Sequence, residues 1–403
     1  MASDWLTGAL AGKIPKRILA PAPVAWRTKP SSKLGDTLFP GIELTDDRFS
    51  GAITNVSGRP FDLDKFRGGA FLGLVCHVPF GFCGFVLLAS TFLCSCDKFT
   101  GAKPKRLKVG FAQIGSEGPW RDTNTRSIKE EAQKRNIDLI FFESQNRALK
   151  GGQQQPAQKE ALRSFIKEKV DVIAFSPVVE QGWSDVLNEA KANGIPVILS
   201  DRGVTESDES LVATFIGSDF TEEGRRAARW LVDAADQDQE PINILEVAGT
   251  PDSAPAIQRH RGFREVLDRY QERLRIVQSV IGNFNSDEAE KVTAAFLASK
   301  DSNEIKAVFA HSDAMAFAAI RALEKSGFKP GSQVKVVSID ATDEGCQEIA
   351  KGRLNCAVEC KSRLGVHVFD AAEAAAKSMA LPARIIIAEG VYDQSNVGQC
   401  GHE

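Results

Sequence analysis

From Arg106 onward, short β-rich runs alternate with runs whose apolar residues repeat at helical spacing. A first series of strands is predicted at RLKVGFAQI (106–114), DLIFFES (138–144), DVIAFSP (171–177), PVILSD (196–201) and ATFIGSD (213–219). A second series is predicted at INILEVAG (242–249), RIVQSVIG (275–282), IKAVFAHS (305–312), VKVVSID (334–340) and NCAVEC (355–360). Because strand–helix alternation is typical of parallel α/β construction, we expect two successive doubly wound sheets, each forming one lobe.

The first 96 residues follow a different pattern. Residues 1–67 show no sustained period, so we assign them no fold and treat them as a disordered leader; whether they are translated stays open. Residues 68–96 contain no charged side chain and are apolar enough to enter a bilayer. This segment ends in Leu93-Cys94-Ser95-Cys96, which resembles a bacterial lipoprotein signal box, so we expect Cys96 to be the lipidated mature N-terminus. An uncleaved membrane anchor is the alternative.

Composition narrows the function. The formal net charge of −3 over 403 residues is too small to indicate a nucleic-acid partner. The eight cysteines form no C-x-x-C pair, so no metal site is expected from their spacing. Cys356 and Cys360 would lie about 13 Å apart on one strand and should not pair with each other. Whether disulfides join any of Cys346, Cys356, Cys360 and Cys400 stays open.

Candidate binding residues lie where predicted strands end, because ligands of open parallel sheets bind outside the carboxyl ends of the strands. These positions hold Ser116, Glu117, Trp120, Arg121, Asp201, Arg202, Ser312, Asp313 and Asp340. Carboxylates accept and guanidinium groups donate hydrogen bonds, so together they satisfy sugar hydroxyls, and an aromatic face covers the ring. A single Asp at such a junction can instead be a helix N-cap, as expected where Asp219 precedes Glu222 and where Asp313 opens a helical run. An Arg cannot cap, which favours binding.

From Leu107 to about Asp393 the chain resembles type I periplasmic sugar-binding proteins, particularly members that bind galactofuranose. The resemblance rests on VGFAQIGSEGPWR, FSPVVEQGW, ILSDRG, AIQRHRGF, AHSDAMA, VVSIDA and CAVEC, which occur in order. It implies two lobes joined by three crossings near Ser218, Glu359 and Glu389. The N-terminal lobe would comprise residues 107–217 plus 361–388, and the C-terminal lobe residues 218–360 plus 389–403, after a linker at 97–106.

The resemblance also implies which residues touch the sugar. It adds Arg259 in the second lobe and Glu359 at a crossing to the strand-end residues above, and it implies no catalytic residue, cofactor or metal. Ser312 stands where the family has an asparagine, so sugar capture is implied without fixing which sugar is bound.

The implied function is that of an extracytoplasmic, monomeric solute-binding protein that delivers a monosaccharide to an ABC-type permease. A receptor that signals to a sensor kinase or chemoreceptor is one alternative. A lactose-repressor-type regulator is another, but residues 1–67 offer no helix-turn-helix. An enzyme is not expected, because the chain contains no G-x-G-x-x-G after the first strand, no P-loop and no G-x-S-x-G. His311 and Trp183 are expected to be packing residues.

Overall fold

The computed structural model describes residues 105–144, 151–235, 241–299 and 304–401. The leader at 1–67, the apolar segment at 68–96 with Cys96, and most of the linker at 97–106 lie outside the described residues. Within the described ranges, no helix is long and apolar enough to cross a bilayer.

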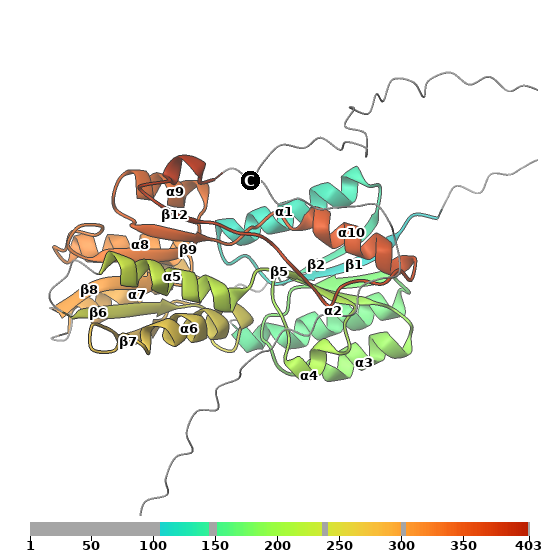
Figure 1. The fold of residues 1–403 in the computed structure, drawn as a ribbon. Helices are drawn as coiled ribbons and strands as arrows, with labels where there is room; N and C mark the ends of the chain where they lie inside the picture. Colours follow the sequence, from blue (N-terminus) through green and yellow to red (C-terminus); the bar gives the residue numbers. More distant parts are fainter. Residues whose placement is uncertain (1–104, 145–150, 236–240, 300–303, 402–403) are drawn as a thin grey trace, which may run out of the picture. The chain divides into compact units, whose positions relative to one another are not determined.

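The first sheet is entirely parallel and has the order β11-β5-β4-β3-β1-β2. Its strands are β1 (Lys108–Gln113), β2 (Asp138–Glu143), β3 (Val172–Phe175), β4 (Val197–Ser200), β5 (Thr214–Gly217) and β11 (Arg384–Ile386). Figure 1 shows helices on both faces. One face carries α1 (Pro119–Lys134) and α10 (Gly365–Ala376), and the other carries α2 (Gln155–Lys167), α3 (Ser184–Ala192) and the short α4 (Glu206–Glu209).

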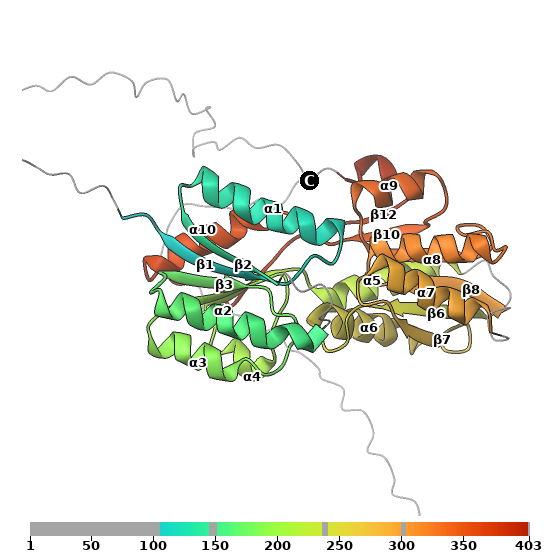
Figure 2. The same ribbon diagram turned by 180° about the vertical axis from the view of Figure 1, so that it is seen from behind.

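The second sheet has the matching order β12-β10-β9-β8-β6-β7. Its strands are β6 (Ile242–Ala248), β7 (Leu274–Ile281), β8 (Ile305–Ala310), β9 (Lys335–Asp340), β10 (Cys356–Glu359) and β12 (Val391–Asp393). One face carries α5 (Phe220–Ala234) and α6 (Ala254–Leu267), and the other α7 (Ser286–Leu297) and α8 (Asp313–Lys325) (Figure 2). The remaining helices are α9 (Asp343–Ala350) and the 3-10 turns η2 (Gly151–Gln154) and η4 (Val397–Gln399).

The expectation of two doubly wound sheets is confirmed, and all ten predicted strands form. The sequence pattern missed β11 and β12, which are three residues long and follow α10. β12 pairs antiparallel with β10, so the second sheet is parallel except at one edge.

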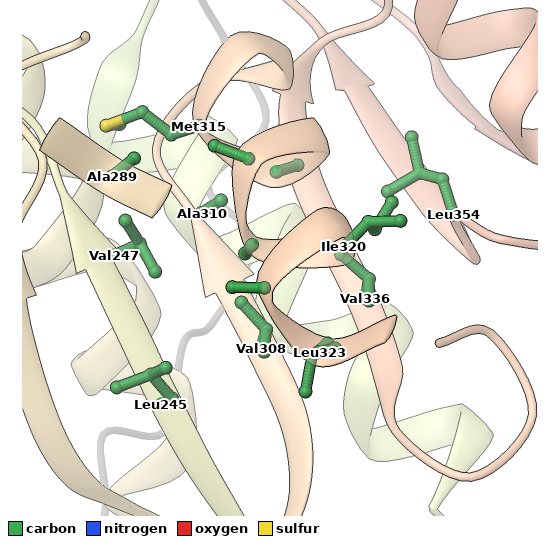
Figure 3. Close-up of a cluster of buried hydrophobic side chains, with 14 of the residues drawn as sticks. Leu245, Val247, Ala289, Val308, Ala310, Met315, Ile320, Leu323, Val336 and Leu354 are labelled. Atoms are coloured by element: carbon green, nitrogen blue, oxygen red, sulfur yellow. The ribbon is translucent and has the colours of Figure 1, made fainter. Parts of the chain in front are cut away.

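Small side chains let the helices lie close to the second sheet. Figure 3 shows α8 packed over β8 and β9, with Val308 and Val336 beneath Ile320 and Leu323. Four alanines of α8 are fully buried there, at positions 316, 318, 319 and 322. Such packing fixes the start of α8, which reaches the candidate site described below.

The chain passes between the sheets three times, after β5, between β10 and α10, and between β11 and β12. The three crossings are bonded to one another. The Ser218 hydroxyl donates to Glu389 Oε1 at 2.5 Å and lies 3.4 Å from Cys360 Sγ. The Lys361 backbone N–H donates to the same Glu389 oxygen at 2.9 Å. These contacts therefore join the three crossings to one another.

A disulfide joins Cys346 to Cys400, with the Cα atoms 5.7 Å apart, and so ties the C-terminal segment to α9. Cys356 and Cys360 do not pair with each other, as expected, and both are free and buried, at the start of β10 and just after its end. The sequence alone had left open whether Cys346 and Cys400 form a disulfide.

Candidate ligand-binding site

A cavity of about 560 Å³ opens at the carboxyl ends of strands from both sheets. Its wall includes nine of the predicted residues: Glu117, Trp120, Arg121, Asp201, Arg202, Arg259, Ser312, Asp313 and Asp340. Two others stand apart from it. Ser116 donates its hydroxyl proton to Asp122 Oδ1 at 2.7 Å, and Glu359 accepts from the Gly390 N–H at 2.7 Å beside β12.

Arg121 and Asp201 form a buried ion pair on the first sheet's side, with Arg121 Nη2 and Asp201 Oδ2 2.6 Å apart. Ser176, after β3, donates to the same carboxylate oxygen at 3.2 Å. Asp201 follows β4 with a φ of 68°, a conformation that costs energy in a residue with a side chain. The bonds from Arg121 and Ser176 hold the carboxylate toward the cavity in spite of that cost.

Arg202 lies beside this pair and is almost fully buried. It donates to Glu117 Oε2 at 2.5 Å, and its guanidinium lies over the Phe284 ring, 5.3 Å from the centroid. Burial lowers the pKa of Arg202, and the charge of Glu117 opposes that shift.

Two donors in this group lack an acceptor. The Nε–H groups of Arg121 and Arg202 are buried and have no hydrogen-bond partner among the described residues. A buried unsatisfied donor costs about 1–3 kcal/mol. An oxygen of a bound molecule would remove that cost, so these groups mark a place where a ligand fits.

Arg259 supplies the cation on the second sheet's side. Its Nε donates to Glu223 Oε2 at 2.7 Å, and its Nη1 donates to the His311 carbonyl at 2.6 Å. The guanidinium also lies 5.0 Å from the centroid of the Phe220 ring. Arg259 is therefore held from three directions at the cavity wall.

The position of Arg259 depends on the close approach of α5 and α6. A Cβ at Gly262 would lie 1.9 Å from the Thr221 carbonyl oxygen, and one at Gly224 would lie 2.2 Å from the Arg259 carbonyl oxygen. Only glycine fits at either place, because both obstacles are backbone.

Asp313 and Asp340 form a second acidic group. Asp313 accepts from Ser338 Oγ at 2.5 Å and from both the N–H and hydroxyl of Thr342 at 2.8 Å, while its own N–H donates to Asp340 Oδ2 at 3.3 Å. Burial raises the pKa of Asp313 to about 6, and burial together with the charge of Asp313 raises the pKa of Asp340 well above its usual value. When it is protonated, either carboxyl can donate a hydrogen bond as well as accept one.

The expectation that Asp313 acts as a helix N-cap is wrong. Ser312 caps α8, since its hydroxyl accepts from the Met315 N–H at 3.3 Å, and Asp313 is the first helical residue. The Asp313 carboxylate instead ties α8 to the loop after β9. The cap predicted at Asp219 is confirmed, because its side chain accepts from the Glu222 N–H at 2.9 Å.

Trp120 closes one side of the cavity. Its indole N–H donates to the Cys360 carbonyl at 2.6 Å, and the Arg121 guanidinium lies 4.7 Å from its ring centroid. Trp120 is thus hydrogen-bonded to the crossing segment between β10 and α10.

Phe284, in the loop after β7, is a wall residue that the sequence interpretation missed. The Arg202 guanidinium lies over its ring, and the Arg259 guanidinium lies 6.0 Å from the ring centroid. Phe284 is therefore close to one cation from the first sheet's side of the cavity and one from the second sheet's side. Phe284 is apolar and lies outside the strand-end positions from which binding residues were predicted. An aromatic residue three positions after β7 was the available signal.

Two packing expectations are confirmed. Trp183 is fully buried against Phe175. His311 is fully buried at the end of β8, where its Nε2 lies 3.0 Å from Glu246 Oε1 and its Nδ1 accepts from the Gly249 N–H.

Comparison with known proteins defines the class. The family model of the periplasmic binding protein domain matches residues 109–396, so this chain belongs to that family. It is 35% identical over 282 residues to the galactofuranose-binding protein YtfQ of Escherichia coli, and the match covers 70% of this chain and 86% of that protein. It is 28% identical to the fructose import binding protein FruE of Bifidobacterium longum, and that match covers 68% of this chain and 80% of FruE.

Solved structures agree with this assignment. A Mycobacterium smegmatis protein in complex with β-D-fucofuranose is 42% identical, with a TM-score of 0.68 over 73% of this chain and 93% of that one. The arabinose transporter's binding component from Shewanella, bound to L-arabinofuranose, is 37% identical, with a TM-score of 0.66 over 72% and 93%. The chain is accordingly a solute-binding protein and not an enzyme.

Proposed function

We propose that this chain captures a monosaccharide in the cavity, with a furanose ring as the first choice, and delivers it to an ABC-type permease. The observation that carries the proposal is the convergence of buried Arg and Asp side chains from both sheets on one cavity, with two arginine N–H groups that lack an acceptor. Relatives that bind fucofuranose and arabinofuranose support the ring type.

The binding contacts divide between two lobes. The N-terminal lobe (residues 107–217 plus 361–388) supplies Asp201, Arg121 and Arg202, which bind ring hydroxyls, and Trp120, which covers the ring's C–H face. The C-terminal lobe (residues 218–360 plus 389–403) supplies Arg259, Asp313 and Asp340, which bind the other hydroxyls. Glu117 orients Arg202. Ser116 and Glu359 act from outside the cavity, where Glu359 supports the crossing beside Gly390.

A sugar held from both lobes favours the closed arrangement, because it has contacts there that an open arrangement lacks. The bonded crossings at Ser218, Cys360 and Glu389 serve as the hinge. Small-angle scattering should therefore show a smaller radius of gyration when the sugar is present.

The location follows from the family's periplasmic setting, and we place the protein outside the cytoplasm. We further propose that it is a monomer anchored through lipid at Cys96. Transport is favoured over signalling to a kinase or chemoreceptor, because several relatives are import binding proteins.

A thermal-shift screen tests the proposal with pentoses, hexoses, furanose-forming sugars and polyols. Binding to the folded state alone raises the melting temperature, by an amount that grows with concentration over Kd. We expect one sugar class to raise it in the parent and to fail in Arg202→Ala. If no member of the panel raises the melting temperature of the parent, sugar capture is the wrong function.

A further inference from the structure

Beside the ligand cavity, a second group of side chains gathers where the three crossings meet. It consists of Glu223 from α5, Cys360 from the segment after β10, and Glu389 from the segment after β11, and we call it the hinge cluster. One ligand-type atom from each lies within 4.8 Å of the other two. In the proposed sugar-binding arrangement none of these three side chains contacts the sugar, although Glu223 holds Arg259 in place and the other two lie at the hinge.

The chemistry of the hinge cluster matches a metal site. A thiolate sulfur and carboxylate oxygens are ligands that Zn²⁺ takes in proteins, and thiolate favours zinc over the hard cations calcium and magnesium. The Ser218 hydroxyl, 3.4 Å from Cys360 Sγ and 2.5 Å from Glu389 Oε1, is a neutral oxygen at the same place.

An independent observation comes from Glu223, whose side chain is about 1% exposed. Its Oε2 accepts from Arg259, and its buried Oε1 meets no donor at hydrogen-bond geometry among the described residues, although the Cys360 side chain is near enough to the carboxylate to lower its pKa. A buried carboxylate oxygen without a donor is costly, and a cation would satisfy it.

Charge also balances. With a divalent cation bound, the three anionic ligands are offset by the cation together with Arg259, which already pairs with Glu223. Burial raises the pKa of the Cys360 thiol and of both carboxyls, so any of the three that is protonated before binding must release its proton to solvent, because metal ligands must be deprotonated.

We propose that the hinge cluster binds a divalent cation of the zinc type, through Glu223, Cys360 and Glu389. Since these ligands come from α5 and two crossings, the cation would bridge segments that move when the lobes close. This second part rests on the proposed function: Zn²⁺ and sugar would each change the affinity of the other by the same factor.

Equilibrium dialysis with Zn²⁺ on the sugar-free chain tests the site, and Cd²⁺ supplies an absorbance band that reports thiolate coordination. We expect Cys360→Ser to weaken Zn²⁺ binding at the cluster at least tenfold and to remove the part of the Cd²⁺ band that this thiolate contributes. Glu389→Gln should weaken Zn²⁺ as well. Cys356→Ser is the matched control, because Cys356 is the other buried free thiol described and lies outside the cluster. It should keep both signals.

Thiols in residues 68–96 contribute equally to parent and variants, so only the difference is read. Melting curves confirm that each variant is folded. If Cys360→Ser binds Zn²⁺ as tightly as the parent, or if Cys356→Ser loses as much, the site is wrong. The dialysis needs no sugar, so its failure is separate from any failure of the sugar screen.

Discussion

Asp201 and Asp340 occupy equivalent positions in the two sheets. Asp201 directly follows β4, the fourth strand from the β2 edge of the first sheet, and Asp340 is the last residue of β9, the fourth strand from the β7 edge of the second. Both are buried, and both have positive φ, at 68° and 121°. Each also lies near an arginine, since Asp201 pairs with Arg121 and the charge of Arg259 lowers the pKa of Asp340 against larger opposing effects. Backbone strain of this kind persists where the surroundings hold it, commonly at ligand sites. The sheets thus present paired carboxylates to one cavity.

Arg202→Ala should weaken sugar binding roughly a hundredfold or more. Breaking a buried ion pair costs about 3–5 kcal/mol, and about 1.4 kcal/mol corresponds to tenfold in affinity. The variant leaves Glu117 without its 2.5 Å partner and removes the unpaired Nε–H donor. Arg202→Lys keeps the charge but not the planar guanidinium, so its affinity for the sugar should lie between those of the parent and Arg202→Ala.

Calorimetry with the sugar found in the screen measures this change. Arg126→Ala is the control, because Arg126 is exposed at the cavity wall and should bind within threefold of the parent. Binding of Arg202→Ala within threefold of the parent would show that the sugar lies elsewhere.

Without sugar, the free energy of unfolding should fall as pH rises from about 4 through 6 and beyond, because Asp313 and Asp340 have raised folded-state pKa values. A raised pKa contributes stability that is full below the unfolded value and is lost as pH passes the folded value. Asp340→Asn should lose less stability over this range, since a neutral amide adds no second charge beside Asp313.

Urea unfolding at several pH values, with a chelator present, gives the comparison. Asp343→Asn, at an exposed neighbour, should follow the parent at every pH. Parallel curves for the parent and Asp340→Asn would contradict the electrostatic coupling of the two carboxyls.

Reduction of the Cys346–Cys400 disulfide should lower the melting temperature. The bond spans a sequence separation of 54, which corresponds to at most about 4 kcal/mol by chain entropy. It also holds Gly401 at the cavity wall. Cys346→Ser should melt like the reduced parent, and reductant should not shift the variant further. A parent that melts identically with and without reductant would rule out a stabilising role.

The mature protein is expected to begin at Cys96 and to carry lipid. Mass spectrometry of protein extracted from membranes checks this, and Cys96→Ser should abolish the modification. Recovery of a chain that begins at Met1, or of unmodified Cys96, contradicts the prediction.

Local patterns were sufficient for much of the fold. Ten strands followed from short apolar runs, and Asp219 was recognisable as a cap because its partner is three residues away. Asp313 could not be read correctly, since its partners Ser338 and Thr342 are 25 and 29 residues away in the chain. Phe284 was missed for a related reason: its role depends on cations that only the tertiary fold brings to its ring.

Local sequence patterns predicted most of the cavity wall, but they did not predict the contacts among the three crossings beside it. Strand-end residues predicted eight of its wall positions, because parallel strands end on a common edge, and the ninth, Arg259 on α6, came only from the family resemblance. Nothing local predicted that Ser218, Cys360 and Glu389 would meet, because each lies on a different crossing. Such contacts follow from the path of the whole chain.

The glycine contact between α5 and α6 places a limit on redesign of the binding site. Any attempt to change the preferred sugar through Arg259 must retain Gly224 and Gly262, although neither has a side chain to offer a sugar. A methyl group at Gly262 would displace α6 from α5 and carry the Arg259 guanidinium away from its place at the cavity wall. In the binding arrangement proposed above, helix spacing would therefore contribute to selectivity, and mutational libraries confined to the cavity wall would not sample it.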